Sequence, residues 1–198
     1  MDALVALFAW PFVTLAAYLR FLLGACFCVV PLASHGTKDF IRLYKALCGF
    51  PFGKHVFSGL VSFFAPYSSS VNPCVERLDE NGCEISVRDW WWLRNPYSCL
   101  HAIALANIGE QAGGILMLSL LQRVKVRAIP VRVDTVYHVK ARGVITGICE
   151  GVSLENVKEK KELPVVTKMY DKKQTLVAQT TVYWMVEPRN EDKEKKKE

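Results

Sequence analysis

The fold of this chain is decided by residues 96–118, which read PYSCLHAIALANIGEQAGGILML. The stretch is rich in Ala and Leu, has a proline near its start and offers Ser98 as a capping residue, so we predict a helix. Between Arg94 and Arg123 the only formal charge is that of Glu110. Apolar residues occur on every side of this helix, which predicts burial on all sides, either in a protein core or in lipid.

The polar residues of this stretch favour a protein core over a membrane. A carboxylate in the middle of a bilayer costs roughly 2.5–3.5 kcal/mol even on the lenient scale of membrane insertion. Gly109 and Gly113 form a G-x-x-x-G pair, which also occurs where membrane helices dimerise. In a protein core, the same small residues predict a close approach of a sheet to the helix. The polar residues in question are His101, Asn107, Glu110 and Gln111.

Six segments with the composition of β-strands lie on either side of the predicted helix in the chain. Each is rich in β-branched residues, and the first two flank Asn81-Gly82, a strong hairpin signal. A single antiparallel sheet wrapped around one apolar helix accounts for the strand number and covers the helix, so the predicted fold class is α+β. The predicted strands are 71–78, 83–89, 128–139, 143–151, 163–170 and 174–186.

Residues 1–34 predict a membrane anchor. Residues 3–19 carry no charge, and the apolar character resumes after Arg20. The segment is too long and continuous for a signal peptide, lacks the basic start of one, and is too apolar for a typical transit peptide. The alternative is a hydrophobic helix buried against a partner protein. Basic residues follow closely, so the positive-inside bias places the bulk of the protein on a cytosolic or matrix side.

The rest of the chain divides into three further parts. Residues 35–66 predict an amphipathic helical linker, with helices over 38–48 and 54–64. Residues 67–187 contain the central helix and all the predicted strands. Residues 188–198 mix both signs of charge, and we expect them to be disordered.

Charge and cysteine usage exclude some kinds of partner. The net charge is +6, but the largest basic excess is spread over residues 124–186 without a recognised nucleic-acid-binding module. We therefore expect no nucleic-acid partner. The seven cysteines are odd in number, form no C-x-x-C motif and have no Cys/His spacing that suits zinc. We expect free thiols in a reducing compartment and no metal.

The residues at the start and middle of the predicted helix resemble a known motif. Asn95 precedes His101-Ala102 with five residues between them, and Glu110 lies nine residues after the histidine. Together with the strand order over roughly residues 60–186, this pattern resembles the hotdog-fold thioesterase superfamily, in its uncharacterised thioesterase-like branch. The resemblance implies a hotdog fold and an acyl-CoA thioester as substrate, with no bound cofactor.

The resemblance also implies catalytic roles. The first backbone N–H groups of the helix, around His101 and Ala102, would polarise the thioester carbonyl, because they are unpaired and lie at the positive end of the helix dipole. Asn95 would add a donor or position water. Glu110 would act as the general base or the nucleophile.

Substrate binding and helix geometry imply a pair of domains. Lys140 and Arg142 lie near a predicted strand turn and are candidates for the CoA phosphates. His101 and Glu110 are nine residues apart and about half a turn around the helix, so one chain cannot easily bring both to one carbonyl. We therefore expect a homodimer, or pairing with another hotdog domain, in which the acid of one subunit works with the helix start of the other.

Departures from the motif leave a second interpretation open. Ile103 stands where the family commonly has a second glycine, and it would narrow the pocket entrance. Glu110 could instead be a buried acid bonded to a neighbouring subunit, and His101 a simple helix cap. Two hypotheses follow: a membrane-anchored protein that hydrolyses or binds acyl-CoA, or a silent accessory subunit of a mitochondrial inner-membrane complex. We expect the domain to face the mitochondrial matrix, with the cytosolic face of the endoplasmic reticulum as the alternative.

Overall fold

The computed structural model describes residues 39–155 and 157–189. The predicted membrane anchor at residues 1–34 and nearly all of the predicted tail at 188–198 lie outside the described residues. The chain divides into two compact units, Met1–Ser70 and Val71–Glu198. The first unit is helical in its described part, and the second is built on a β-sheet.

Two helices, α3 (Phe40–Cys48) and α4 (Gly53–Phe64), form most of the described part of the first unit. They pack through an edge-to-face contact between Tyr44 and Phe57, whose ring centroids are 5.1 Å apart. A short 3-10 helix, η2 (Ser68–Val71), follows them. The predicted amphipathic helix is present as α3, and its buried residues are Ile41, Tyr44 and Leu47.

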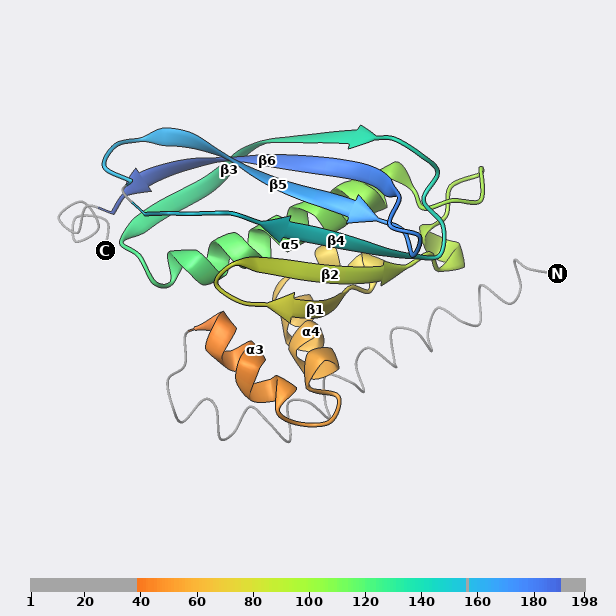
Figure 1. The fold of residues 1–198 in the computed structure, drawn as a ribbon, viewed down its shortest axis with the longest axis horizontal. Helices are drawn as coiled ribbons and strands as arrows, with labels where there is room; N and C mark the ends of the chain where they lie inside the picture. Colours follow the sequence, from red (N-terminus) through yellow and green to blue (C-terminus); the bar gives the residue numbers. More distant parts are fainter. Residues whose placement is uncertain (1–38, 156, 190–198) are drawn as a thin grey trace. The chain divides into compact units, whose positions relative to one another are not determined.

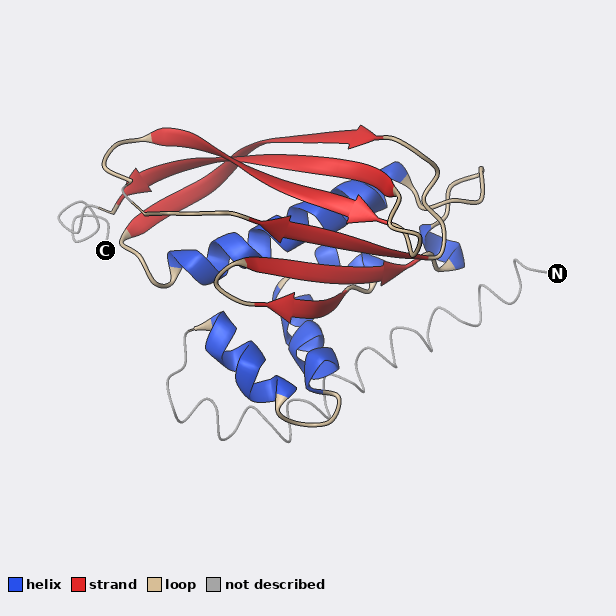
Figure 2. Ribbon diagram, viewed as in Figure 1, coloured by secondary structure: helices blue, strands red, loops and turns tan. Residues whose placement is uncertain are grey.

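The second unit is built on one six-stranded antiparallel sheet (Figure 2). The strand order is β1-β2-β4-β5-β6-β3, so β1 and β3 form the two edges. The first two strands form the predicted hairpin, whereas β3 pairs with β6, the last strand in the chain. The strands are β1 (Cys74–Leu78), β2 (Gly82–Arg88), β3 (Val126–Tyr137), β4 (Val144–Glu150), β5 (Lys161–Tyr170) and β6 (Leu176–Pro188).

One long helix, α5 (Ala102–Leu121), lies along one face of the sheet, which curves around it (Figure 1). Two glycines allow the close approach that the sequence predicts. A Cβ at Gly109 would lie 2.3 Å from Thr180 Cβ, and a Cβ at Gly113 would lie 3.0 Å from Val165 Cγ1. The predicted antiparallel sheet around a central helix is confirmed.

The start of α5 differs from the prediction. The helix begins at Ala102 with His101 as its N-cap, and not near Ser98. Ser98 has a φ of 55°, in the left-handed region that a right-handed helix cannot contain. Residues 95–100 therefore form a turn, closed by a 3.0 Å hydrogen bond from the Ser98 N–H to the Asn95 carbonyl oxygen. This turn is preceded by a short 3-10 helix, η3 (Trp91–Leu93).

Within the described part of the chain, α5 is the one helix long and apolar enough to cross a membrane. The most apolar 18-residue stretch of α5 has a mean hydropathy of 1.3, but 67% of that stretch is buried inside the protein. A helix that is apolar all round and packed against a sheet is the core of a protein domain.

Candidate functional site

Glu110 lies in the middle of α5, on the side of the helix that is partly open. Ile103 and Leu118, seven residues before it and eight after it, lie on the same side and are 58% and 49% exposed. Gly114 lies beside the carboxylate, because a Cβ there would be 3.4 Å from Glu110 Oε1. Burial raises the pKa of the Glu110 carboxyl. The open side of α5 therefore carries a half-buried acid that is more basic than usual.

Two side-chain amides flank Glu110 on α5. Asn107 Oδ1 and both polar atoms of the Gln111 amide are buried and have no hydrogen-bond partner among the described residues. Buried polar atoms without a partner are uncommon in native proteins and indicate a water, a ligand or a second chain. The sequence did not assign these two residues to the site, although they stand out in it as polar positions within an apolar helix.

A row of threonines supports α5 next to Glu110. Thr167, Thr180 and Thr135 are register partners across β5, β6 and β3. Thr167 Oγ1 donates a hydrogen bond to the Gly109 carbonyl oxygen over 2.8 Å, and the hydroxyl oxygens of Thr180 and Thr135 lie 3.0 Å apart. The row holds the helix backbone at the residue immediately before Glu110.

The imidazole ring of His101 caps α5. Its Nδ1 accepts a hydrogen bond from the Ile103 backbone N–H over 3.1 Å. The Ala102 carbonyl oxygen accepts one from the Tyr137 hydroxyl over 3.0 Å, which ties the end of β3 to the helix start. The Ala102 backbone N–H has no acceptor within the described residues, so it is available to bind a carbonyl oxygen.

Asn95 organises the turn before α5. Its Oδ1 accepts hydrogen bonds from the backbone N–H groups of Tyr97, over 2.9 Å, and Cys99, over 3.4 Å. The Cys99 thiol also lies 3.3 Å from this oxygen. Because Oδ1 is used within the turn, the donor that Asn95 offers to a bound molecule is its Nδ2 group.

Lys140 and Arg142 lie against the same turn. Arg142 Nε donates a hydrogen bond to the Ser98 carbonyl oxygen over 3.0 Å. The Lys140 ammonium lies 5.5 Å from the centre of the Tyr97 ring. Both basic residues are exposed. The structure thus brings these two candidates to the turn that Asn95 organises, directly before the helix start.

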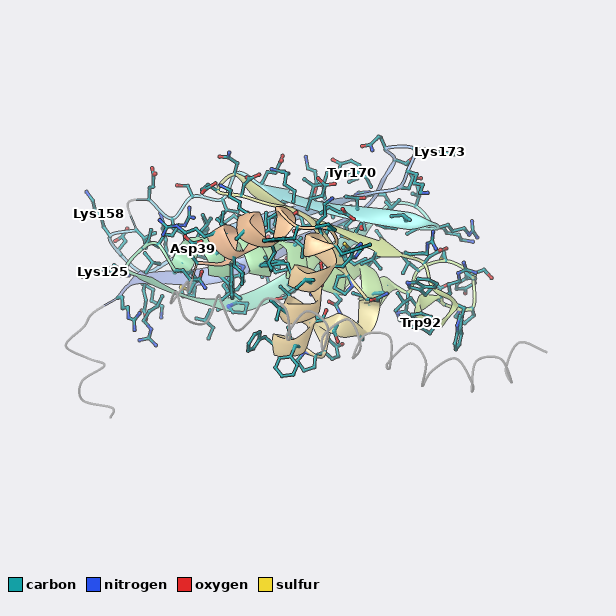
Figure 3. The ribbon with its side chains drawn as sticks, turned by 90° about the horizontal axis from the view of Figure 1, so that it is seen from below. Asp39, Trp92, Lys125, Lys158, Tyr170 and Lys173 are labelled. Carbon is teal, nitrogen blue, oxygen red and sulfur yellow. The ribbon has the colours of Figure 1, made fainter. Side chains whose placement is uncertain are left out.

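Glu110 is the one candidate that lies apart from the others in the chain. Nine residues of helix separate it from His101, about 13 Å along the axis. In Figure 3, Trp92, shortly before the turn, lies at one end of the sheet unit, and Lys125, shortly after α5, lies at the other.

Among the residues that the structure describes, no group of three or more His, Cys, Asp or Glu side chains forms a metal site.

A six-stranded antiparallel sheet curved around one long helix defines the hotdog fold, and this chain has it. Solved structures share it at low sequence identity, among them the following three. A structural-genomics target aligns with 75% of the chain and 98% of its own length, at 22% identity and a TM-score of 0.63. A protein of unknown function from Pseudomonas aeruginosa, described as a probable thioesterase, aligns with 66% of the chain and 92% of its own (16% identity, TM-score 0.59). A variant of a thioesterase from Staphylococcus aureus aligns with 62% and 99% (15% identity, TM-score 0.53).

The chain belongs to the family DUF4442, a domain of unknown function, whose sequence model matches residues 53–186. The matched region includes α4 and extends from β1 into β6. No curated protein matches the chain in a sequence comparison. The hotdog fold that the resemblance implies is confirmed, and the matching family is itself one of unknown function.

Proposed function

We propose that this chain hydrolyses acyl-CoA thioesters, with Glu110 as the general base or nucleophile. The observation that carries the proposal is the half-buried Glu110 carboxyl on the open side of α5, in a fold that solved thioesterases also have. Burial raises the pKa of this carboxyl. A carboxylate with a raised pKa accepts a proton from water more readily near neutral pH.

The helix start supplies the groups that stabilise charge on the substrate. The Ala102 N–H, at the positive end of the α5 dipole, would bind the thioester oxygen, and Asn95 Nδ2 would position water or add a second donor. As a base, Glu110 takes a proton from water while the water oxygen attacks the carbonyl carbon. The tetrahedral intermediate then loses the C–S bond, and the proton passes to the CoA sulfur. As a nucleophile, the Glu110 carboxylate would attack the carbonyl carbon and expel CoA as its thiolate, which leaves a mixed anhydride. Water would then cleave the anhydride to the fatty acid and the Glu110 carboxylate, and a proton from that water would pass to the CoA sulfur.

The separation of Glu110 from the helix start supports a site shared by two chains. The edge strand β3 is suited to pairing, because it is 12 residues long and exposes apolar side chains. Unpaired apolar edges readily add a further strand. We propose that a second hotdog domain, from an identical or a related chain, pairs with β3. The exposed apolar residues of β3 include Ile129, Val131, Val133 and Val136.

Lys140 and Arg142 belong to the proposal as the binding site for the CoA phosphates. Both are exposed beside the turn and carry the charge that phosphate requires. Arg142 also bonds the Ser98 carbonyl, so its loss would disturb the turn itself. Lys140→Gln is the cleaner test: it should raise KM for acyl-CoA and leave unchanged the KM for the same acyl group on pantetheine, which lacks the nucleotide. An equal rise for both would remove Lys140 from phosphate binding.

Membrane anchoring through residues 1–34 completes the proposed function. The uncharged run at 3–19 is close to the ~20 apolar residues that span a bilayer. The basic residues that follow favour a matrix-facing domain at the mitochondrial inner membrane, or a cytosol-facing one at the endoplasmic reticulum. An anchored enzyme would act on acyl-CoA held at the membrane surface.

The test is hydrolysis by the purified full chain, in nanodiscs, of short-, medium- and long-chain acyl-CoA. Glu110→Gln should lower kcat by about 10²-fold or more, because removal of a general base typically has that effect. Glu162→Gln makes the same substitution at an exposed glutamate of β5 and should leave kcat unchanged. If Glu110→Gln keeps full activity, Glu110 has no part in the mechanism.

A catalytically silent accessory subunit is the second candidate. Two observations favour it: Asn95 Oδ1 and His101 Nδ1 are already engaged in bonds within the chain, and Ile103 stands exposed at the helix start. This function predicts no turnover of any acyl-CoA and co-purification with a large membrane complex. A chain isolated as a homodimer with thioesterase activity would contradict it.

A further inference from the structure

The turn between α3 and α4 presents two aromatic side chains to solvent. Phe50 is 68% exposed and Phe52 is 79% exposed, with Pro51 between them. Buried side chains lie on both sides of this turn in the chain, at Leu47 and Phe57. Neighbouring large aromatic side chains at such exposure indicate a surface that binds a protein or a membrane.

Phe52 is held in its exposed position at a local cost. Its φ of 63° lies in the left-handed region, where a bulky residue is a true outlier. It is also the N-cap of α4, a position where its side chain makes no capping hydrogen bond. Glycine, serine or asparagine would suit this position better on both counts. Strained backbone conformations of bulky residues cluster at functional sites.

Hydrogen bonds and close packing hold the backbone of the turn that carries the two aromatic rings. The Phe50 N–H donates to the Leu47 carbonyl oxygen over 3.0 Å, and the Gly53 N–H donates to the Phe50 carbonyl oxygen over 3.1 Å. Gly53 packs so closely that a Cβ there would lie 1.8 Å from the Leu47 oxygen. The backbone positions of both aromatic residues are therefore set by the fold of the chain itself.

The charge around the turn is basic. Arg42 is paired with Asp39 over 3.6 Å, but residues 43–75 contain Lys45 and Lys54 and no aspartate or glutamate. Lys45 lies in the last turn of α3 and Lys54 in the first turn of α4, so both flank the aromatic turn, and both are exposed. Aromatic residues flanked by lysines are typical of segments that lie in the interface of an anionic membrane.

We infer that the Phe50–Phe52 turn inserts into the interface of an anionic lipid membrane. This inference rests on the proposed membrane anchor, since that anchor would end at residue 34, only sixteen residues before Phe50. The anchor would hold the chain at the membrane, and the aromatic turn would fix how the helical unit lies on its surface. The rings enter the lipid interface while the lysines meet the headgroups.

The test is photo-crosslinking of the full chain in nanodiscs of phosphatidylcholine and phosphatidylserine. Benzoylphenylalanine in place of Phe52 should form lipid adducts several-fold more often than the same probe in place of Lys173, an exposed residue of the β5–β6 turn. The double variant Lys45→Gln/Lys54→Gln should lower the yield at position 52. Equal yields at the two positions, or adducts at 52 only with protein, whether residues 1–38 or a second copy, would overturn the inference.

A second variant keeps the test independent of misfolding. Phe52→Gly should raise the melting temperature, because glycine relieves the left-handed strain, while it lowers the yield of lipid adducts from a probe at position 50. A Phe52→Gly chain that is more stable and still crosslinks fully to lipid would contradict a membrane role for Phe52.

The anchor and the enzymatic activity are tested separately. A chain that does not enter nanodiscs lacks the proposed anchor, and the aromatic turn is then tested by flotation with phosphatidylserine vesicles. Absence of binding in that assay would overturn the inference. Hydrolysis of dissolved acyl-CoA tests the role of Glu110 independently of whether the aromatic turn binds lipid.

Discussion

Thr167 on β5 donates a hydrogen bond to the carbonyl oxygen of Gly109 on α5 over 2.8 Å. Thr167 is fully buried, and Gly109 immediately precedes Glu110 in the chain. The bond joins the sheet to the helix at the point where the candidate catalytic side chain leaves the backbone. It therefore sets the position of Glu110, although neither residue of the pair carries any charge.

Loss of this bond should affect both stability and catalysis. Thr167→Val keeps the shape of the side chain but removes the hydroxyl donor, so we expect a loss of about 1 kcal/mol in the free energy of unfolding. We also expect kcat for thioester hydrolysis to fall more than KM changes. Denaturant unfolding and steady-state kinetics check this. Thr181→Val, on the opposite face of β6, should change the free energy of unfolding by less than about 0.5 kcal/mol.

The two glycines on either side of Glu110 should respond in opposite directions to alanine. Gly109→Ala would place a Cβ 2.3 Å from Thr180 Cβ, so the helix must move and the chain should lose about 1–3 kcal/mol. Gly114→Ala would place a Cβ 3.4 Å from Glu110 Oε1, which is ordinary contact, and should gain up to about 1 kcal/mol of helix propensity. Thermal unfolding of both variants measures the difference. A stable Gly109→Ala variant would show that α5 does not lie this close to β6.

The pH dependence of stability should reveal the burial of Glu110. The pKa of its carboxyl is raised by burial above the ordinary value of 4.5, so the folded chain binds its proton more tightly than the unfolded chain. This stabilising contribution is complete below pH 4.5 and is lost as pH rises through the raised pKa. Glu110→Gln should therefore match the natural chain at low pH and exceed its stability at neutral pH. Denaturant unfolding at several pH values measures this, and a constant difference would mean that the carboxyl is not buried.

Pairing through β3 should be sensitive to charge on that strand. Val133 is 47% exposed on the edge strand, and Val133→Lys should convert a dimer to a monomer, because a charged side chain is unfavourable where a second strand must pack. Thioesterase activity should fall with it if the site is shared. Light scattering in detergent gives the oligomeric state. Val139→Lys, at 49% exposure beyond the end of β3, is the matched control and should leave the dimer intact.

Much of the fold could be predicted from the residues alone, because strand composition and helix composition are local properties. The strand predicted at 163–170 is Lys161–Tyr170 in the structure, and the one at 128–139 is Val126–Tyr137. The prediction near Ser98 was wrong, because its left-handed backbone depends on the bonds that Asn95 and Arg142 make to the turn. No pattern of residue types in the sequence encodes those bonds.

The sequence by itself predicted that one apolar helix bearing a single acid lies against a sheet, because its polar residues favour a protein core over lipid and the strands beside it in the chain can cover it. Only the tertiary structure decided that β3 returns to the far edge beside β6. That pairing aligns Thr135 with Thr180 under Gly109 and leaves β3 open to a second chain. The physical reason is the distance along the chain over which each effect acts. Composition sets helix and strand formation within a few residues, whereas strand order is set by contacts between residues far apart in the chain.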